Sequence, residues 1–177
     1  MSLYRYTPSK AELTAVMLDR ALGNPPQLEP KAHGWRATLT AWASALNDGF
    51  SAHPWALELA VGARVVGPCE LNWMEAGLRT LVGTGLTGAE RLDALALIIG
   101  HVRGMIQQGV DPSGATNQPE RAVDVLMADI IAEHAERYPE VRAAFTDART
   151  SATQDNAAQF GLERILDGLQ AVITQRA

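Results

Sequence analysis

Apolar residues recur three and four positions apart along almost the whole chain, and no run alternates as a β-strand would. Ser9 and Glu12 open the first apolar segment with the spacing of a capping box, and Gly23 ends it. The pattern predicts an all-α fold. The expected helices occupy approximately residues 9–22, 34–52, 54–59, 68–81, 87–108, 119–138, 140–148 and 155–175.

Two segments stand out from this regular pattern. The proline-rich stretch 24–33 cannot continue a helix and predicts a linker. It divides the chain into residues 1–23, the linker 24–33 and a larger domain, 34–177. The segment 87–108 is apolar nearly all round, so we expect that helix to be buried on more than one side.

Composition narrows the class of protein. The chain has 177 residues, 47% of them hydrophobic, and a net charge of -5, which excludes a mainly disordered chain. A single cysteine, Cys69, excludes a disulfide framework and a multi-cysteine zinc site. The sequence shows neither a membrane span nor a secretory signal, so we expect a cytoplasmic protein without a membrane partner. The acidic balance makes this chain, taken alone, a poor electrostatic match for nucleic acid.

No motif predicts catalysis. The run Gly83–Gly88 matches the dinucleotide fingerprint, but it follows a helical segment instead of a strand and is better interpreted as a connection between helices. No partner base stands near Cys69 in sequence, and no histidine pair has metal-ligand spacing. We therefore predict no enzyme, no catalytic residue, no metal and no cofactor.

Several residues allow two interpretations. His101 and His134 lie in apolar helical stretches, either as hydrogen-bonded core residues or as polar anchors of a ligand pocket. Gly100 and Gly104 permit close packing, within one subunit or across a dimer interface, or leave space for a ligand. Tryptophans recur on three consecutive predicted helices and suit either a core or a pocket.

The opening run Leu3–Leu13 closely resembles the segment of TetR-family transcriptional repressors that ends the recognition helix and starts the connecting helix. Further along, His53-Pro54-Trp55, Gly67-Pro68 and Phe160–Leu169 resemble the tetracycline-repressor type of C-terminal domain. The resemblance implies a helical bundle that forms a homodimer through a four-helix interface. It also implies that a small molecule entering this domain releases operator DNA.

The resemblance, combined with the inward faces of the helices, implies three sets of site residues. Tyr4, Tyr6 and Lys10 match residues that touch operator phosphates. The expected dimer interface comprises Gly100, Gly104, Leu162, Ile165, Leu166, Leu169, Val172 and Ile173. The expected pocket for a small apolar or aromatic effector comprises Trp42, Leu46, Trp55, Trp73, Met74, His101, Met105, Leu126, Ile130 and His134. Ala60 falls near the histidine that chelates drug-bound magnesium in tetracycline repressors, so a tetracycline–magnesium ligand is not expected.

The alignment with the family places the start of this chain within the end of the recognition helix. We therefore expect residues 1–23 to be a remnant of a helix-turn-helix domain, and DNA binding only from a full-length form that contains the helix-turn-helix. The predicted function is that of the ligand-sensing and dimerisation part of a TetR-type repressor. The alternative is a stand-alone helical module that binds a small molecule and dimerises without binding DNA.

Overall fold

The computed structural model describes residues 9–28, 30–62, 64–109, 130–131, 133–150 and 157–176. Within these ranges the secondary structure is helical, without a strand, as the apolar spacing predicts. The helices are α1 (Lys10–Leu22), α2 (Pro30–Ala52), α3 (Trp55–Leu59), α4 (Pro68–Thr80), α5 (Gly88–Gln107), α7 (Pro139–Thr150) and α8 (Ala157–Thr174).

Local sequence explains where several of these helices begin. The Ser9 side chain accepts a hydrogen bond from the Glu12 N–H at the start of α1. At the start of α5, Thr87 and Glu90 form a complete capping box. α2 begins at Pro30, four residues before its predicted start, and leaves helical geometry at Gly34, where φ is 77°. The predicted helix 34–52 is therefore the part of α2 that follows this break.

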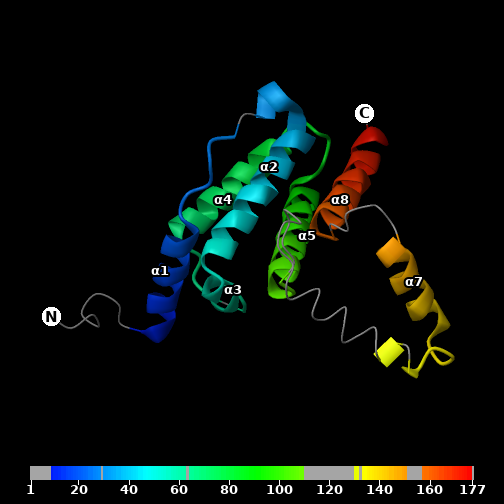
Figure 1. Cartoon of the computed structure of the whole chain (residues 1–177). Coiled ribbons are helices and arrows are strands. Elements are labelled where there is room, and N and C mark those ends of the chain that lie inside the picture. Colours follow the sequence, from blue (N-terminus) through cyan, green and yellow to red (C-terminus); the bar gives the residue numbers. More distant parts are fainter. Residues whose placement is uncertain are drawn as a thin grey trace.

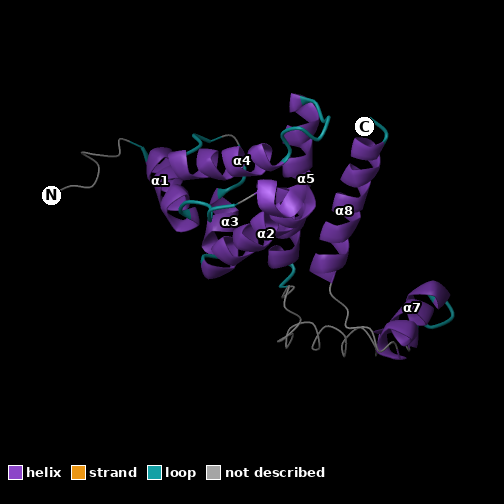
Figure 2. Cartoon of the chain, turned by 90° about the horizontal axis from the view of Figure 1, so that it is seen from above, coloured by secondary structure: helices purple, strands orange, loops and turns teal. Residues whose placement is uncertain are grey.

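The helices form two packed groups that meet at α5 (Figures 1 and 2). α1, α2 and α4 pack against one another, and the short α3 packs against α1. α5 packs against α2 on one side and α8 on another, and its Ala94, Leu95, Ile98 and Val102 are buried. α5 thus contacts two helices, but its Leu92 and Leu97 are exposed, so the prediction that this helix is buried on more than one side holds only in part.

One continuous core connects α1, α2, α4, α5 and α8. Its largest fully buried side chains are Leu18, Leu39, Trp42, Leu81, Ile98 and Leu166. The glycine-rich run that matches a dinucleotide fingerprint lies between the end of α4 and the start of α5, so its interpretation as a helix–helix connection is confirmed. α7 stands apart from the other helices in both views (Figures 1 and 2).

Candidate functional site: the α3–α4 joint and the outer face of α5 and α8

Three of the predicted pocket residues lie in the core. Trp42 is fully buried and contacts Trp73 edge-to-face, with their ring centroids 6.0 Å apart. The Trp42 indole N–H donates to the Trp73 carbonyl at 3.0 Å, and the Trp73 indole N–H donates to the Gly23 carbonyl at 2.9 Å. Leu46 is buried in the same core. Because both indole donors are already satisfied within the chain, these two tryptophans hold α1, α2 and α4 together.

His101 connects the two long helices of the second group. Its Nε2 lies 2.7 Å from the Ala158 carbonyl oxygen, and because a carbonyl only accepts, Nε2 is the donor. Gly161 lies directly under the imidazole, where a Cβ would overlap the ring. His101 therefore links α5 to the first turn of α8 and depends on a residue without a side chain there. Its Nδ1 is the only nitrogen left for a ligand.

The remaining predicted pocket residues lie nearer the surface. Those within the described ranges are half-buried or exposed: Trp55, Met74, Met105, Ile130 and His134. The His134 ring packs edge-to-face against Tyr138 at 6.5 Å. Leu126 lies outside the described residues. Helical spacing thus identified apolar positions but did not separate those facing the core from those that remain accessible.

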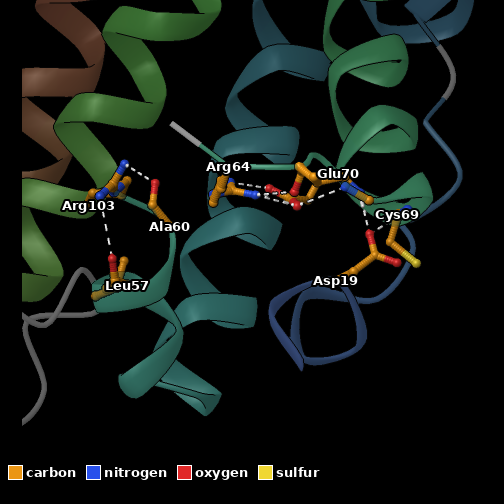
Figure 3. A network of polar contacts seen from close by, with 9 residues as sticks. Asp19, Leu57, Ala60, Arg64, Cys69, Glu70 and Arg103 are labelled. Carbon is orange, nitrogen blue, oxygen red and sulfur yellow. Dashed lines mark hydrogen bonds and ion pairs between the residues drawn. The ribbon is translucent and has the colours of Figure 1, made fainter. Parts of the chain in front are cut away.

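A series of polar contacts connects α5 to α1 through the segment joining α3 to α4 (Figure 3). The Arg103 guanidinium of α5 lies 3.4 Å from the Ala60 carbonyl oxygen and 3.5 Å from that of Leu57, both near the end of α3. Further along the segment, the Arg64 guanidinium pairs with both carboxylate oxygens of Glu70 in the first turn of α4. The segment between Leu59 and Pro68 is called the α3–α4 joint below. These contacts attach it to α5 on one side and to the first turn of α4 on the other.

Asp19 of α1 caps the start of α4. The N-cap position of α4 is Gly67, which has no side chain to satisfy the free amides of the first turn. The Asp19 Oδ1 accepts the Cys69 N–H at 2.8 Å and the Glu70 N–H at 3.1 Å. Asp19 is only 8% exposed, and a Cβ at Gly67 would overlap its carboxylate. The partial positive charge at the start of a helix stabilises this buried anion, so α1 and α4 are held in one relative position.

The same carboxylate affects the only cysteine. Burial raises the pKa of the Cys69 thiol above its usual value, and the hydrogen bond and negative charge of Asp19 raise it further. A raised pKa keeps the thiol protonated and unreactive near neutral pH. The sequence likewise places no partner base near Cys69.

Sequence reasoning did not identify Asp19 or Arg103. A local signal for Asp19 did exist, because Gly67-Pro68 opens a helix without any capping side chain of its own. The residue that supplies the cap is about fifty positions earlier, however, and no sequence spacing reveals such a partner. Arg103 lies between apolar neighbours on α5, and its position on the helix gave no indication of which helix it faces.

The dimer interface stays a prediction, and five of its six α8 residues are half-buried within a single chain. The residues predicted on α8 pack inward against the chain's own core: Leu162, Ile165, Leu166, Leu169, Val172 and Ile173. Leu166 is 1% exposed and therefore cannot contact a partner without rearrangement. Of the two predicted glycines, Gly100 is exposed and Gly104 is half-buried.

A different set of α5 and α8 residues is exposed. The large apolar side chains that remain uncovered there are Leu92, Leu97 and Phe160, with exposed fractions of 47%, 59% and 63%. Together with Gly100, these residues are called the outer face of α5 and α8 below. The apolar excess of α5 that the sequence reveals is therefore only partly buried within one chain.

Of the three residues predicted to contact DNA phosphates, the structure describes one. Lys10 is exposed at the first residue of α1, where an ammonium group is accessible. Tyr4 and Tyr6 lie outside the described residues.

Other candidate sites give no support for chemistry. Among the described residues, no group of three or more His, Cys, Asp or Glu side chains is arranged to hold a metal ion. A surface recess of about 540 Å³ lies against Arg142, Ala143, Thr146 and Asp147, all on α7. A recess lined by one exposed helix does not enclose a ligand. None of the helices searched in the described ranges is long and apolar enough to cross a membrane.

Comparison with known proteins agrees with this helical architecture. Residues 26–173 match the family described as "Tetracyclin repressor-like, C-terminal domain". The chain is also 35% identical to the HTH-type transcriptional repressor DrrR1 of Streptomyces coeruleorubidus, over 99% of this chain and 67% of that protein. The fold and both similarities define a helical domain of the tetracycline-repressor-like C-terminal type, found in transcriptional regulators. This chain belongs to the TetR family of transcriptional regulators.

Proposed function

We propose that the chain is the ligand-sensing and dimerisation part of a TetR-type repressor that acts as a homodimer. The observation that carries this proposal is the outer face of α5 and α8, where an apolar surface remains uncovered on two adjacent helices. Large apolar side chains that stay exposed on two packed helices are typical of a surface that a partner covers. The same face on a second copy would complete a four-helix interface with two-fold symmetry.

The α3–α4 joint supports a route from the sensing domain to the connecting helix. Asp19 fixes α1 to the start of α4, while Arg103 attaches the end of α3 to α5. An effector that binds one arrangement of these helices more tightly would shift the population towards it and move α1 accordingly. In the form that carries a helix-turn-helix, the displaced α1 would change the spacing of the two DNA-binding heads.

Introducing a charge on the outer face of α5 and α8 tests the dimer. Leu97→Glu places a carboxylate from each copy within the proposed apolar interface, and Leu71→Glu on α4 is the matched control because Leu71 is similarly exposed. We expect sedimentation velocity to show a dimer for the native chain and for Leu71→Glu, and a monomer for Leu97→Glu. A dimer that persists in Leu97→Glu, or a native monomer, would contradict the proposed interface.

The stand-alone module is the second candidate function, since the outer face of α5 and α8 suits it equally. The form carrying a helix-turn-helix should retard DNA from the region flanking its own gene in a gel-shift assay. Lys10→Ala should weaken that binding for every DNA sequence alike, as loss of a phosphate contact does. A protein that dimerises and binds small molecules but never retards this DNA would favour the module.

A further inference from the structure

Arg103 carries a half-buried positive charge that the protein itself satisfies only weakly. A guanidinium has five N–H donors, and those of Arg103 reach only the Leu57 and Ala60 carbonyls, at 3.5 and 3.4 Å. Both distances are longer than the usual range for such bonds. The Arg103 Nε is buried and has no hydrogen-bond partner. Three of its five N–H donors, the buried Nε among them, therefore have no hydrogen-bond partner in the described part of the chain.

Three other arginines in the described part of the chain pair with carboxylates. Arg36 pairs with Asp167, Arg64 with Glu70 and Arg176 with Glu90, and each contact includes a carboxylate oxygen. Arg103 forms no such pair among the described residues. A half-buried cation without an anion is costly, because it loses water and gains no opposite charge.

A structural role does exist for Arg103, since basic side chains commonly cap the carbonyls at a helix end. α3 has only five residues, however, so few aligned peptide dipoles attract the cation. The long distances to both carbonyls indicate that capping uses only part of its hydrogen-bonding capacity.

A second unsatisfied group lies at the other end of α3. The Nδ1 of His53 is buried and has no partner, and His53 stands two residues before the first residue of α3. A five-residue helix is about 7.5 Å long, so a ligand of ordinary size can reach both ends. Trp55, the first residue of α3, packs edge-to-face on His53 with the ring centroids 5.9 Å apart, and its aromatic ring is partly exposed. Buried polar atoms without partners call for a specific explanation, and a missing ligand is one.

We infer that Arg103 binds an anionic oxygen group of the effector, with the His53 imidazole offering a further hydrogen bond. This inference rests on the proposed sensing function and specifies the chemistry of its ligand. The effector is then an aromatic or apolar molecule that carries a carboxylate, a sulfonate or a similar acidic group. Guanidinium groups bind such planar or multi-oxygen anions through paired hydrogen bonds, which lysine cannot reproduce.

Two fluorescent probes with the same aromatic frame test this chemistry. 8-Anilinonaphthalene-1-sulfonate carries an anionic oxygen group, whereas N-phenyl-1-naphthylamine lacks it. Both should be titrated into the native dimer and into Arg103→Met, with circular dichroism and thermal unfolding confirming that each variant is folded. Arg91→Met is the matched control, because Arg91 also lies on α5 and its Nε is likewise buried without a partner.

We expect Arg103→Met to weaken binding of the sulfonate at least about tenfold, as loss of a charge-assisted contact does, and to leave binding of the neutral probe unchanged. Arg103→Lys should recover only part of the loss, and Arg91→Met should bind both probes as the native chain does. Equal effects on the two probes, no effect, or the same loss in Arg91→Met would overturn the inference. If the neutral probe still binds natively, the proposed sensing function stands; if neither probe binds the native chain, both proposals fail.

Discussion

The helices α1, α2 and α4 are joined by contacts that satisfy their buried polar groups, whereas α5 and α8 leave part of their apolar surface uncovered. In the first group, the indole N–H groups and the Asp19 carboxylate all find backbone partners on a neighbouring helix. In the second, cross-helix polar contacts lie at the ends, from His101 to Ala158 and from Glu90 to Arg176, while Leu97 and Phe160 remain exposed. All five helices share one core, but among the three helices of the first group the polar contacts lie between the helices, whereas α5 and α8 keep large apolar side chains exposed.

The largest difference should appear when each group loses one aromatic side chain. Trp42→Ala removes a fully buried ring and an indole hydrogen bond, so we expect unfolding free energy to fall by about 3–5 kcal/mol. Phe160→Ala removes a mostly exposed ring and should change monomer stability by less than about 1 kcal/mol, while weakening the dimer. Urea unfolding at two protein concentrations separates the effects, because only dimer-linked stability depends on concentration. Similar, concentration-independent losses in both variants would remove the distinction between the groups.

A smaller effect on stability is expected where Asp19 of α1 caps the first turn of α4. Asp19→Ala leaves the Cys69 and Glu70 amides without a cap, and we expect a loss of about 1–3 kcal/mol in unfolding free energy. Removing this carboxylate also lowers the pKa of Cys69, because its hydrogen bond and negative charge favour the protonated thiol.

The pH dependence of iodoacetamide alkylation measures that pKa, since the thiolate is the reacting form. Asp19→Asn is the control, because the amide oxygen keeps an acceptor but loses the charge. We expect Asp19→Asn to lose less stability than Asp19→Ala and still to shift the alkylation profile to lower pH. An unchanged profile in both variants would show that Asp19 does not influence the thiol.

The smallest effect concerns the exposed contact between α5 and α8. Hydrogen bonds from Arg176 and from Thr87 lower the pKa of Glu90 to about 2, compared with an ordinary value of 4.5. Because the folded pKa is depressed, this contribution to stability is present above about pH 4.5 and is lost as the pH falls towards 2. Salt should weaken it, since the pair is partly solvent-exposed.

An NMR titration of the Glu90 carboxyl group in the native chain and in Arg176→Ala measures this contact. We expect the pKa to move upward in the variant, towards the ordinary value, and a titration that is the same in both proteins would contradict the assignment. Glu90→Gln should correspondingly flatten the acid side of the stability curve.

The sequence predicted where the helices lie along the chain better than it predicted which surfaces they pack against. Caps such as Ser9 and the all-round apolar character of α5 depend on residues within a few positions, so local spacing revealed them. The surface that buries Leu166 was not predicted, because apolar spacing shows which side of a helix is buried but not which surface buries it; the chain's own core covers this residue. Phe160, whose ring is exposed, stands on the same helix just before the α8 residues that were predicted for the interface.

The same limit applies to the candidate site. His101 was selected as a polar group in an apolar helix, and the structure shows one of its nitrogens used by Ala158. Arg103, two residues away, was not selected. Its unpaired N–H groups become apparent only from its long contact with the carbonyl near the end of α3 and its unpartnered Nε. Such unsatisfied groups become visible only when distant segments are packed together.

The position of Asp19 also bears on how this protein can be divided. A cut after residue 23 would fall just before the proline-rich linker and retain every residue of the larger domain, yet it would remove the Asp19 carboxylate that caps α4. In the fragment 24–177, the first turn of α4, which contains Cys69, would then lack its cap and we expect it to fray. α1 is thus an integral part of the helical domain that follows it in sequence, and we expect the shortest stable fragment to include it.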